Sequence, residues 1–226
     1  MAKTAIDRKK MDALVRNLRK EGAVVLLESQ LGSHPASHKS YVAGLPRKTL
    51  KARDGMLTIS EAGSCKKLRG NIWRLLRQQF SESPDWYFGY LGYDLKNDVE
   101  DLASGNPDYI GAADLFFMVP DFLLKIDHRQ NRCKLLKGNK YNSLNFESGS
   151  EPHELDNLKL STSKFCYQKK VQKILDLISE GDLYEMNFAH QSSSRFRGDS
   201  YSVYIRMREE GPVPYGAYIH TGELDV

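Results

Sequence analysis

The sequence predicts a mixed α/β fold in which helices pack against β-sheets. Segments with apolar residues at helical spacing alternate with short apolar runs that are typical of strands. Two turn signals, at residues 53–55 and 128–131, predict β-hairpins. Hydrophobic residues make up 40% of the 226 residues and aromatic residues 10%, which is enough for a sizeable core.

The first predicted helix ends at residues 21–22, and an apolar run that indicates a buried strand follows at residues 23–27. The apolar side of this helix is formed by Met11, Leu14, Val15 and Leu18. Residues 30–39 are expected to be a loop, and further strands are expected from residue 41 and over residues 56–59. Four leucine and isoleucine positions predict a second helix that stops at residues 83–85: Leu68, Ile72, Leu75 and Leu76. Lys66, Lys67 and Arg69 would be its solvated side.

Residues 86–95 are dense in aromatic side chains and contain Gly89 and Gly92. We expect a core strand here, whose glycines let another backbone approach closely. Strands are also expected on either side of Pro120 and after the second turn signal, over residues 132–136.

A change of composition divides the chain. Residues 138–163 are rich in Gly, Asn, Ser, Glu and Pro without an apolar period, and predict a linker between domains 1–137 and 164–226. The second domain begins with an amphipathic helix that ends at Gly181. A further helix is predicted over residues 201–209 and a final strand over residues 215–220.

Residues 184–188 alternate in polarity directly after Gly181. Tyr184, Met186 and Phe188 would lie on one side of a strand, and Glu185 and Asn187 on the other. Because its second face carries only hydrogen-bonding groups, we expect this strand to border a polar cleft or water.

Composition excludes several classes of protein. The net charge of +4 is spread along the chain rather than clustered, which disfavours nucleic-acid binding. There is no apolar run long enough for a transmembrane helix and no signal peptide. Three widely spaced cysteines suggest neither a disulfide framework nor a zinc site, so a reducing cytoplasm fits best.

The usual catalytic signatures are missing, since the sequence has no GxSxG, HExxH, P-loop or GxGxxG motif. His34 and His38 lie four residues apart, but in a loop and without a third metal ligand nearby.

Two other segments could bind a small molecule. Glu28 and Ser29 end an apolar strand and could meet an ammonium group or an amide, or they could simply begin a turn. Pro214 fixes the backbone beside Tyr215, whose ring could cap a planar ligand or could simply lead into the next strand.

Taken in order, these segments resemble component I of the anthranilate synthase and aminodeoxychorismate synthase family of chorismate-utilising enzymes. The matching segments are Leu-Leu-Glu-Ser at 26–29, Phe-Gly-Tyr-Leu-Gly-Tyr-Asp-Leu at 88–95, residues 179–187, and Pro-Val-Pro-Tyr at 212–215. The resemblance covers essentially the whole chain and implies antiparallel-rich sheets packed with helices. The Leu-Gly-Tyr-Asp-Leu form favours the aminodeoxychorismate branch, with anthranilate synthase as the alternative.

The resemblance also implies substrates, partners and site residues. The family enzyme aminates chorismate with ammonia from a glutamine amidotransferase partner and uses Mg²⁺. Glu185 and Asn187 would lie on the chorismate side. Glu28 and Ser29 would meet the polar end of a bound tryptophan, and Pro214 and Tyr215 would frame its ring.

Three departures from the family pattern matter. Glu185 stands where glutamine is usual, and Gly216 replaces a common methionine, which predicts a more open or less specific effector pocket. The family's serine-proline-glutamate motif, catalytic lysine, histidine and magnesium-binding glutamates do not follow. We therefore expect a truncated protein, with no catalytic residue or metal ligand in these 226 residues and no turnover from them alone. Amino-acid binding without catalysis, or a purely structural role for every motif, stays open as an alternative.

Overall fold

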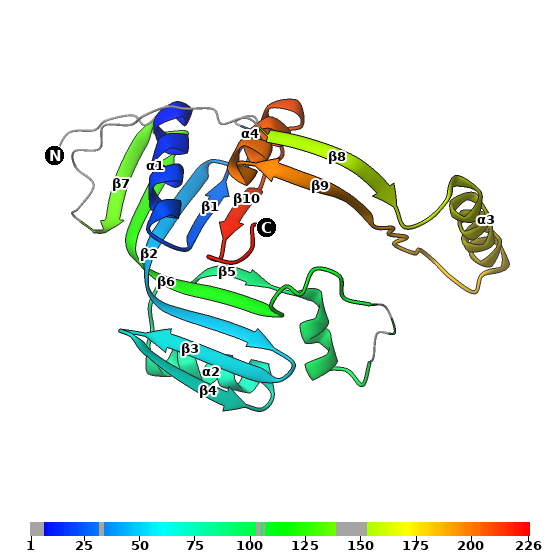
Figure 1. The fold of residues 1–226 in the computed structure, drawn as a ribbon, viewed down its shortest axis with the longest axis horizontal. Coiled ribbons are helices and arrows are strands. Elements are labelled where there is room, and N and C mark those ends of the chain that lie inside the picture. Colours follow the sequence, from blue (N-terminus) through cyan, green and yellow to red (C-terminus); the bar gives the residue numbers. More distant parts are fainter. Residues whose placement is uncertain (1–6, 32–33, 103–104, 106, 139–152) are drawn as a thin grey trace. The chain divides into compact units, whose positions relative to one another are not determined.

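The structure, a computed structural model, describes residues 7–31, 34–102, 105, 107–138 and 153–226 and consists of two compact units (Figure 1). The first unit comprises Met1–Gly149 and Tyr204–Val226, and the second comprises Ser150–Val203. An eight-stranded sheet forms the first unit, and a two-stranded ribbon belongs to the second. All of the strand pairs are antiparallel, so the predicted α/β class with antiparallel-rich sheets is confirmed.

Two long strands, β2 and β6, form the spine of the sheet in the first unit. They pair along most of their length, while β2 also pairs with β1 near its start and with β3 near its end. The strand order is β10-β1-β2-β3-β4, and β5 and β7 pair with β6. The strands are β1 (Val24–Glu28), β2 (Lys39–Arg53), β3 (Met56–Glu61), β4 (Ser64–Arg69), β5 (Phe88–Leu91), β6 (Leu115–Asp127), β7 (Arg132–Lys137) and β10 (Gly216–His220).

Helix α1 (Arg8–Lys20) packs on β1 and β2. The Asp7 side chain accepts a hydrogen bond from the Lys10 N–H and caps the helix. The four predicted apolar residues are all buried: Met11, Leu14, Val15 and Leu18. Gly44 lets the helix approach the sheet, because a Cβ there would lie 3.0 Å from Leu18 Cδ2. The helical period thus identified the face that covers the sheet.

The first turn signal forms the expected hairpin between β2 and β3. Asp54 and Gly55 both have positive φ, 50° and 70°, as a type I′ turn requires. The second signal likewise joins β6 to β7, with Asn131 at φ 48°. Both hairpin predictions are confirmed.

The prediction that Leu68 belongs to a helix is wrong. Leu68 lies in β4, which pairs with β3, and α2 (Ile72–Glu82) begins only after Asn71. A tight turn at Ala62 and Gly63, both with positive φ, returns the chain to β3 and gives this basic segment a partner strand. The helical spacing of apolar residues continued across the boundary by chance, so periodicity alone placed the helix start too early.

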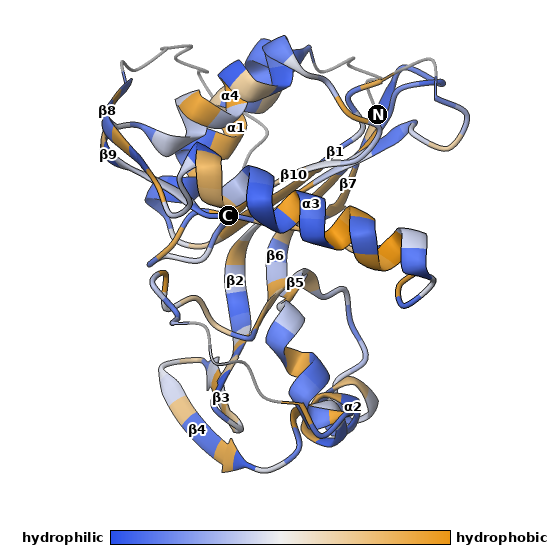
Figure 2. Ribbon diagram, turned by 90° about the vertical axis from the view of Figure 1, so that its right-hand side faces the viewer, coloured by the Kyte–Doolittle hydropathy of each residue, from blue (hydrophilic) through white to orange (hydrophobic). Residues whose placement is uncertain are grey.

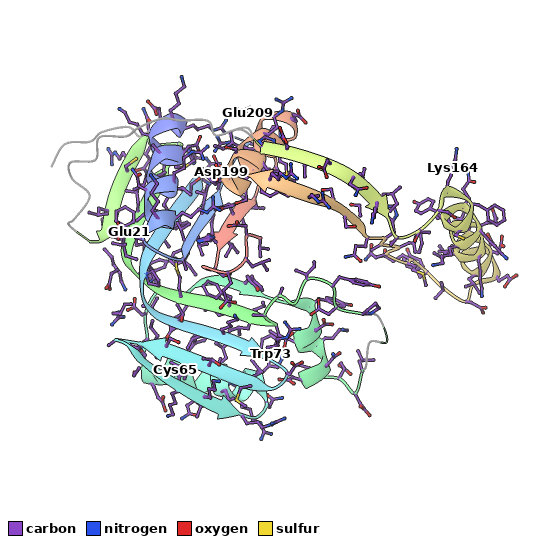
Figure 3. The ribbon with its side chains drawn as sticks, viewed as in Figure 1. Glu21, Cys65, Trp73, Lys164, Asp199 and Glu209 are labelled. Carbon is purple, nitrogen blue, oxygen red and sulfur yellow. The ribbon has the colours of Figure 1, made fainter. Side chains whose placement is uncertain are left out.

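Helix α2 is held against the short 3₁₀ helix η1 (Tyr93–Asp98). The Asp98 carboxylate accepts from the Ile72 N–H at 2.7 Å. Trp73, which is labelled in Figure 3, donates through Nε1 to the Leu95 carbonyl at 3.0 Å. This contact closes a core cluster formed with β2, β3 and β6: Leu50, Ala52, Leu57, Ile59, Ile72, Leu76, Leu95 and Leu115.

The expected break at Pro120 does not divide β6 into two strands. Pro120 lies opposite Pro46 of β2, and a β-bulge shifts the register between Pro46 and Lys48. Neither proline has an N–H to donate to the partner strand. Because the two prolines lie opposite each other, the missing hydrogen bonds fall at the same point, and the pairing continues on both sides of it.

Gly89 confirms the expectation that glycine allows close backbone contact. A Cβ at Gly89 would lie 1.9 Å from the Phe116 carbonyl oxygen on the neighbouring β6. At Gly92 a Cβ would lie 2.8 Å from the Asp114 carbonyl oxygen. Strand β5 therefore depends on Gly89 to pair with β6, and Gly92 lets the chain after β5 lie against Asp114, directly before β6.

The second unit contains β8 (His153–Leu160), α3 (Lys164–Glu180) and β9 (Ser192–Gly198). Ser163 caps α3 and Gly181, at φ 86°, ends it as predicted. Apolar and polar residues alternate along α3 (Figure 2), and none of its residues is buried. Helix α4 (Ser200–Glu210) then leads back into the first unit.

The organisation differs from the predicted domains 1–137 and 164–226. Strand β8 lies inside the predicted linker 138–163, of which residues 139–152 lie outside the described residues. Strand β10 pairs with β1, so the end of the chain belongs to the first unit. Composition could not reveal either pairing, because each depends on a partner strand far away in sequence.

Candidate functional site

The end of β1 gathers the residues of the predicted effector site. Glu28 is the last residue of β1 and pairs with Gly216 of β10, so both lie on the same face of the sheet as Tyr218. Only 2% of Glu28 is exposed. A carboxylate this deeply buried must be neutralised by a cation or by hydrogen bonds.

The cation that neutralises Glu28 is supplied by α4. Arg208 Nη1 lies 3.3 Å from each oxygen of the Glu28 carboxylate. The same guanidinium binds Asp12 of α1 through two hydrogen bonds, at 2.9 and 2.8 Å. Arg8 adds a second, more exposed cation, with Nε 3.7 Å from Glu28 Oε1. This cluster links β1, α1 and α4.

Tyr204 completes the surroundings of the carboxylate. Its hydroxyl donates to Glu28 Oε2 at 2.7 Å and accepts from Gln30 Nε2 at 3.1 Å. Burial raises the pKa of Tyr204 well above its ordinary value, and the Glu28 carboxylate raises it further. The phenol therefore stays protonated and acts as a permanent donor to Glu28.

Gln30 fills the space that Gly216 leaves open. Gln30 is only 8% exposed, and a Cβ at Gly216 would lie 2.1 Å from its Nε2. Its Oε1 accepts from the Val213 N–H at 3.0 Å while its Nε2 donates to Tyr204. Of the two expectations for Gly216, the more open pocket is not formed, because the Gln30 side chain occupies the vacant volume, and the less specific pocket stays a prediction.

Ser29 takes part in a separate chain of hydrogen bonds. Its N–H donates to Ser40 Oγ at 3.0 Å, and its hydroxyl donates to the Lys39 carbonyl at 2.7 Å. Ser40 Oγ lies 2.7 Å from His128 Nε2 and, having accepted from Ser29, can donate to it. Burial lowers the pKa of His128, although the Glu28 carboxylate opposes this effect, so the ring is neutral and accepts.

The structure brings Pro214 into this region but leaves Tyr215 largely exposed. Ser37 Oγ donates to the Pro214 carbonyl, which fixes the turn before β10. Tyr215 is 68% exposed, and its ring forms a T-shaped pair with His34 at a centroid distance of 5.8 Å. Glu28 and the turn before Pro214 are thus joined only through Tyr204 and Gln30 in the contacts described, Ser29 belongs to the separate chain through Ser40, and Tyr215 is exposed.

Glu185 and Asn187 belong to the second unit and are both exposed. The predicted strand over residues 184–188 is not formed, because no described strand pairs with this segment. The ladder of β9 begins only at Ser192. Alternating polarity alone cannot make a strand when a hydrogen-bonding partner is lacking.

Sequence reasoning missed the residues that neutralise and fill the site: Asp12, Gln30, Tyr204 and Arg208. One signal was available, because helical spacing places Arg208 on the inner side of its helix with Tyr204. An arginine on an apolar helix face calls for a buried carboxylate partner. Glu209, the next residue, is exposed on the outside of α4 (Figure 3).

The described residues provide no obvious metal site. No three histidine, cysteine, aspartate or glutamate side chains among them come together in a way that could hold an ion. Across the same residues, no helix is both long and apolar enough to cross a membrane.

Comparison with known proteins identifies similar chains. The family model described as chorismate binding enzyme matches residues 28–226. Aminodeoxychorismate synthase component 1 of Bacillus subtilis is 26% identical over 89% of this chain and 49% of its own length. Anthranilate synthase component 1 of Lactococcus lactis is 27% identical over 84% of this chain and 48% of its own length. The chain therefore spans about half the length of these relatives.

A solved structure supports the fold. The crystal structure of anthranilate synthase component I from Streptococcus pneumoniae superposes with a TM-score of 0.60 at 20% identity. The superposed region covers 83% of this chain and 48% of the solved chain. At this identity the likeness establishes the architecture and says nothing about the reaction.

Proposed function

Because the chain belongs to the family of chorismate-binding enzymes, we propose that it is part of an aminodeoxychorismate synthase component I. The intact protein would convert chorismate and ammonia to 4-amino-4-deoxychorismate in the cytoplasm. A glutamine amidotransferase partner would supply the ammonia.

The observation that carries this proposal is the match to the family model over residues 28–226, which includes three of the quoted motif segments in full. Identity alone does not separate the two possible products, since relatives of both kinds are 26–27% identical. The Leu-Gly-Tyr-Asp-Leu sequence at residues 91–95 favours aminodeoxychorismate over anthranilate.

The two units would have different tasks in such an enzyme. The first unit supplies a rigid sheet and the polar cluster around Glu28. In the second unit, Glu185 and Asn187 would lie on the chorismate side, Glu185 as an acceptor and Asn187 as both donor and acceptor. The described residues do not offer the carboxylate cluster that Mg²⁺ prefers, so we assign no magnesium ligand among them.

The test uses the complete reading frame that contains these 226 codons. The purified protein is incubated with chorismate, Mg²⁺ and ammonium, and an enzyme that eliminates pyruvate from 4-amino-4-deoxychorismate is added to half of each sample. Fluorescent p-aminobenzoate that forms only with the added enzyme is the expected result. Anthranilate in both samples would instead assign the alternative product, and the absence of both would contradict chorismate amination. The 226 residues alone should give neither product.

A second proposal concerns amino-acid binding at Glu28, Ser29, Pro214 and Tyr215, which would make the first unit a regulatory module. It is supported by the buried Glu28 carboxylate at the end of β1 and by Gln30, the residue after Ser29, which accepts from the Val213 N–H directly before Pro214. Isothermal titration with L-tryptophan tests it, with Glu28→Gln as the variant that should lose affinity. No heat at millimolar ligand would contradict this proposal and leave the chorismate proposal intact.

A further inference from the structure

We propose that Gln30 is a built-in occupant of the predicted amino-acid site and that its removal creates a binding site for a small primary amide or a free α-amino acid. The inference rests on the proposed amino-acid site at the end of β1. It assigns to Gln30 the role of the residue that decides whether this site is open.

The side-chain amide of Gln30 makes the hydrogen bonds that a bound primary amide would make. Its amide is held at both ends, with Oε1 3.0 Å from the Val213 nitrogen and Nε2 3.1 Å from the Tyr204 hydroxyl. The side chain lies where a Cβ at Gly216 would come within 2.1 Å of it. Gly216 is not in the left-handed region, so glycine is required here by the space that the amide occupies and not by the backbone.

The backbone on both sides of Gln30 is anchored as well. Arg8 Nη2 donates to the Gln30 carbonyl at 3.0 Å, and Ser29 before it donates twice into β2. Since neither end of this segment is free, the side chain is presented to Tyr204 and Val213 in a fixed position. Because the fold already restricts the backbone of Gln30, less conformational entropy is lost when its amide is held in place.

The groups that would be freed match the chemistry of the proposed ligands. Without the Gln30 amide, the Val213 N–H would offer a donor to a carbonyl or carboxylate oxygen. The Tyr204 hydroxyl, which would still donate to the Glu28 carboxylate, would offer an acceptor to an amide or ammonium group. Because Arg208 already neutralises Glu28, an incoming ammonium would share this carboxylate with the guanidinium.

The first experiment measures rescue of Gln30→Ala by acetamide, which has the size of the deleted group. The variant should unfold at a lower temperature than the unmodified chain, and acetamide at about ten times its dissociation constant should raise its Tm by about 3 °C. Gln78→Ala removes an exposed glutamine from α2 and serves as the control, with no response to acetamide. Equal responses of both variants and the unmodified chain would overturn the proposal.

The second experiment compares tryptophan binding by calorimetry. Gln30→Ala should bind at least about tenfold more tightly than the unmodified chain, which corresponds to the loss of one competing amide. Gln30→Leu keeps the volume filled without the hydrogen bonds and should bind no better than the unmodified chain. Acetamide rescue without tighter tryptophan binding by Gln30→Ala would overturn the amino-acid part of the proposal.

A double-mutant cycle with Gly216→Ala tests whether the Gln30 amide occupies the space beside Gly216, as distinct from a general loss of stability in either variant. The new methyl group should lower Tm in the presence of Gln30 and have at most about half that effect in Gln30→Ala, since the amide that it displaces is gone. Additive effects would contradict the proposed occupancy. The cycle and the titrations measure no product, so their outcome is independent of whether chorismate is aminated.

Discussion

Arg208 and Glu28, 180 residues apart in sequence, form a buried ion pair in which one guanidinium nitrogen lies 3.3 Å from both carboxylate oxygens. The pair fastens α4 to the end of β1 and neutralises the Glu28 carboxylate. Because both side chains are at most 4% exposed, neither charge is solvated well enough to stand alone.

Arg208→Ala should lower the free energy of unfolding by about 3 kcal/mol, because it leaves the Glu28 charge buried with only the more distant Arg8 as a cation. Urea denaturation at neutral pH measures the change. Arg206→Ala, which removes an exposed pair with Glu210 from the same helix, is the matched control and should change stability little. Similar losses of unfolding free energy for both variants would show that the buried Arg208–Glu28 pair stabilises the fold no more than the exposed Arg206–Glu210 pair does.

His128 should make stability depend on pH. Burial holds the pKa of its imidazole below the ordinary value of 6.5, so between the two values the unfolded chain binds more protons than the folded chain. The contribution of His128 to stability is therefore complete above about pH 6.5 and is lost as the pH falls toward the folded-state pKa. Protonation would also remove the acceptor that Ser40 uses.

The measurement is a comparison of unfolding free energies for the native chain and His128→Gln from about pH 7.5 to about pH 5. The native chain should lose more stability over this range than the variant. Other groups around the ring, Glu28, Arg8, Asp127 and His38, are common to both chains and cancel in the difference. Parallel pH curves would contradict the assigned role of His128.

Gly89→Ala should be strongly destabilising, by more than about 2 kcal/mol, because the new methyl group would collide with the Phe116 carbonyl on the adjacent strand. Gly105→Ala is the control, since nothing lies within 4 Å of a Cβ built there. Thermal unfolding of the two variants should differ clearly. If Gly89→Ala proved as stable as Gly105→Ala, the close pairing of β5 with β6 would be wrong.

The two sheets should exchange amide hydrogens at very different rates. The β8–β9 ribbon has almost no buried side chain, and isolated two-stranded ribbons are marginally stable in water. In the first unit, most residues of β6 and about half of those of β2 are buried. Hydrogen exchange followed by mass spectrometry should show early exchange in β8 and β9 and strong protection in β2 and β6. Equal protection would indicate a core in the ribbon that the described residues do not contain.

The sequence predicted those elements whose signals are local. The four apolar residues of α1, the Asp54–Gly55 turn and the cap at Gly181 each depend on a few neighbouring residues, and all three are confirmed. The family resemblance is confirmed as well, since it rests on several short motifs in a fixed order.

The sequence failed where a structure depends on distant partners. Leu68 fitted a helical period although it pairs with β3 as part of β4. Residues 184–188 have the alternation of a strand although no described strand pairs with them. The same limitation affected the site. Glu28 could be identified from its position at a strand end, whereas its partner Arg208 becomes evident only when α4 is placed against β1.

The paired prolines Pro46 and Pro120 have a consequence for how this sheet can diverge. On one side of them β2 and β6 are flanked by β1 and β7, and on the other side by β3 and β5. Among the strands that the structure describes, β2 and β6 alone therefore connect the half that contains Glu28 with the half that packs on α2. Substitutions in one half can therefore accumulate with little effect on the packing of the other half.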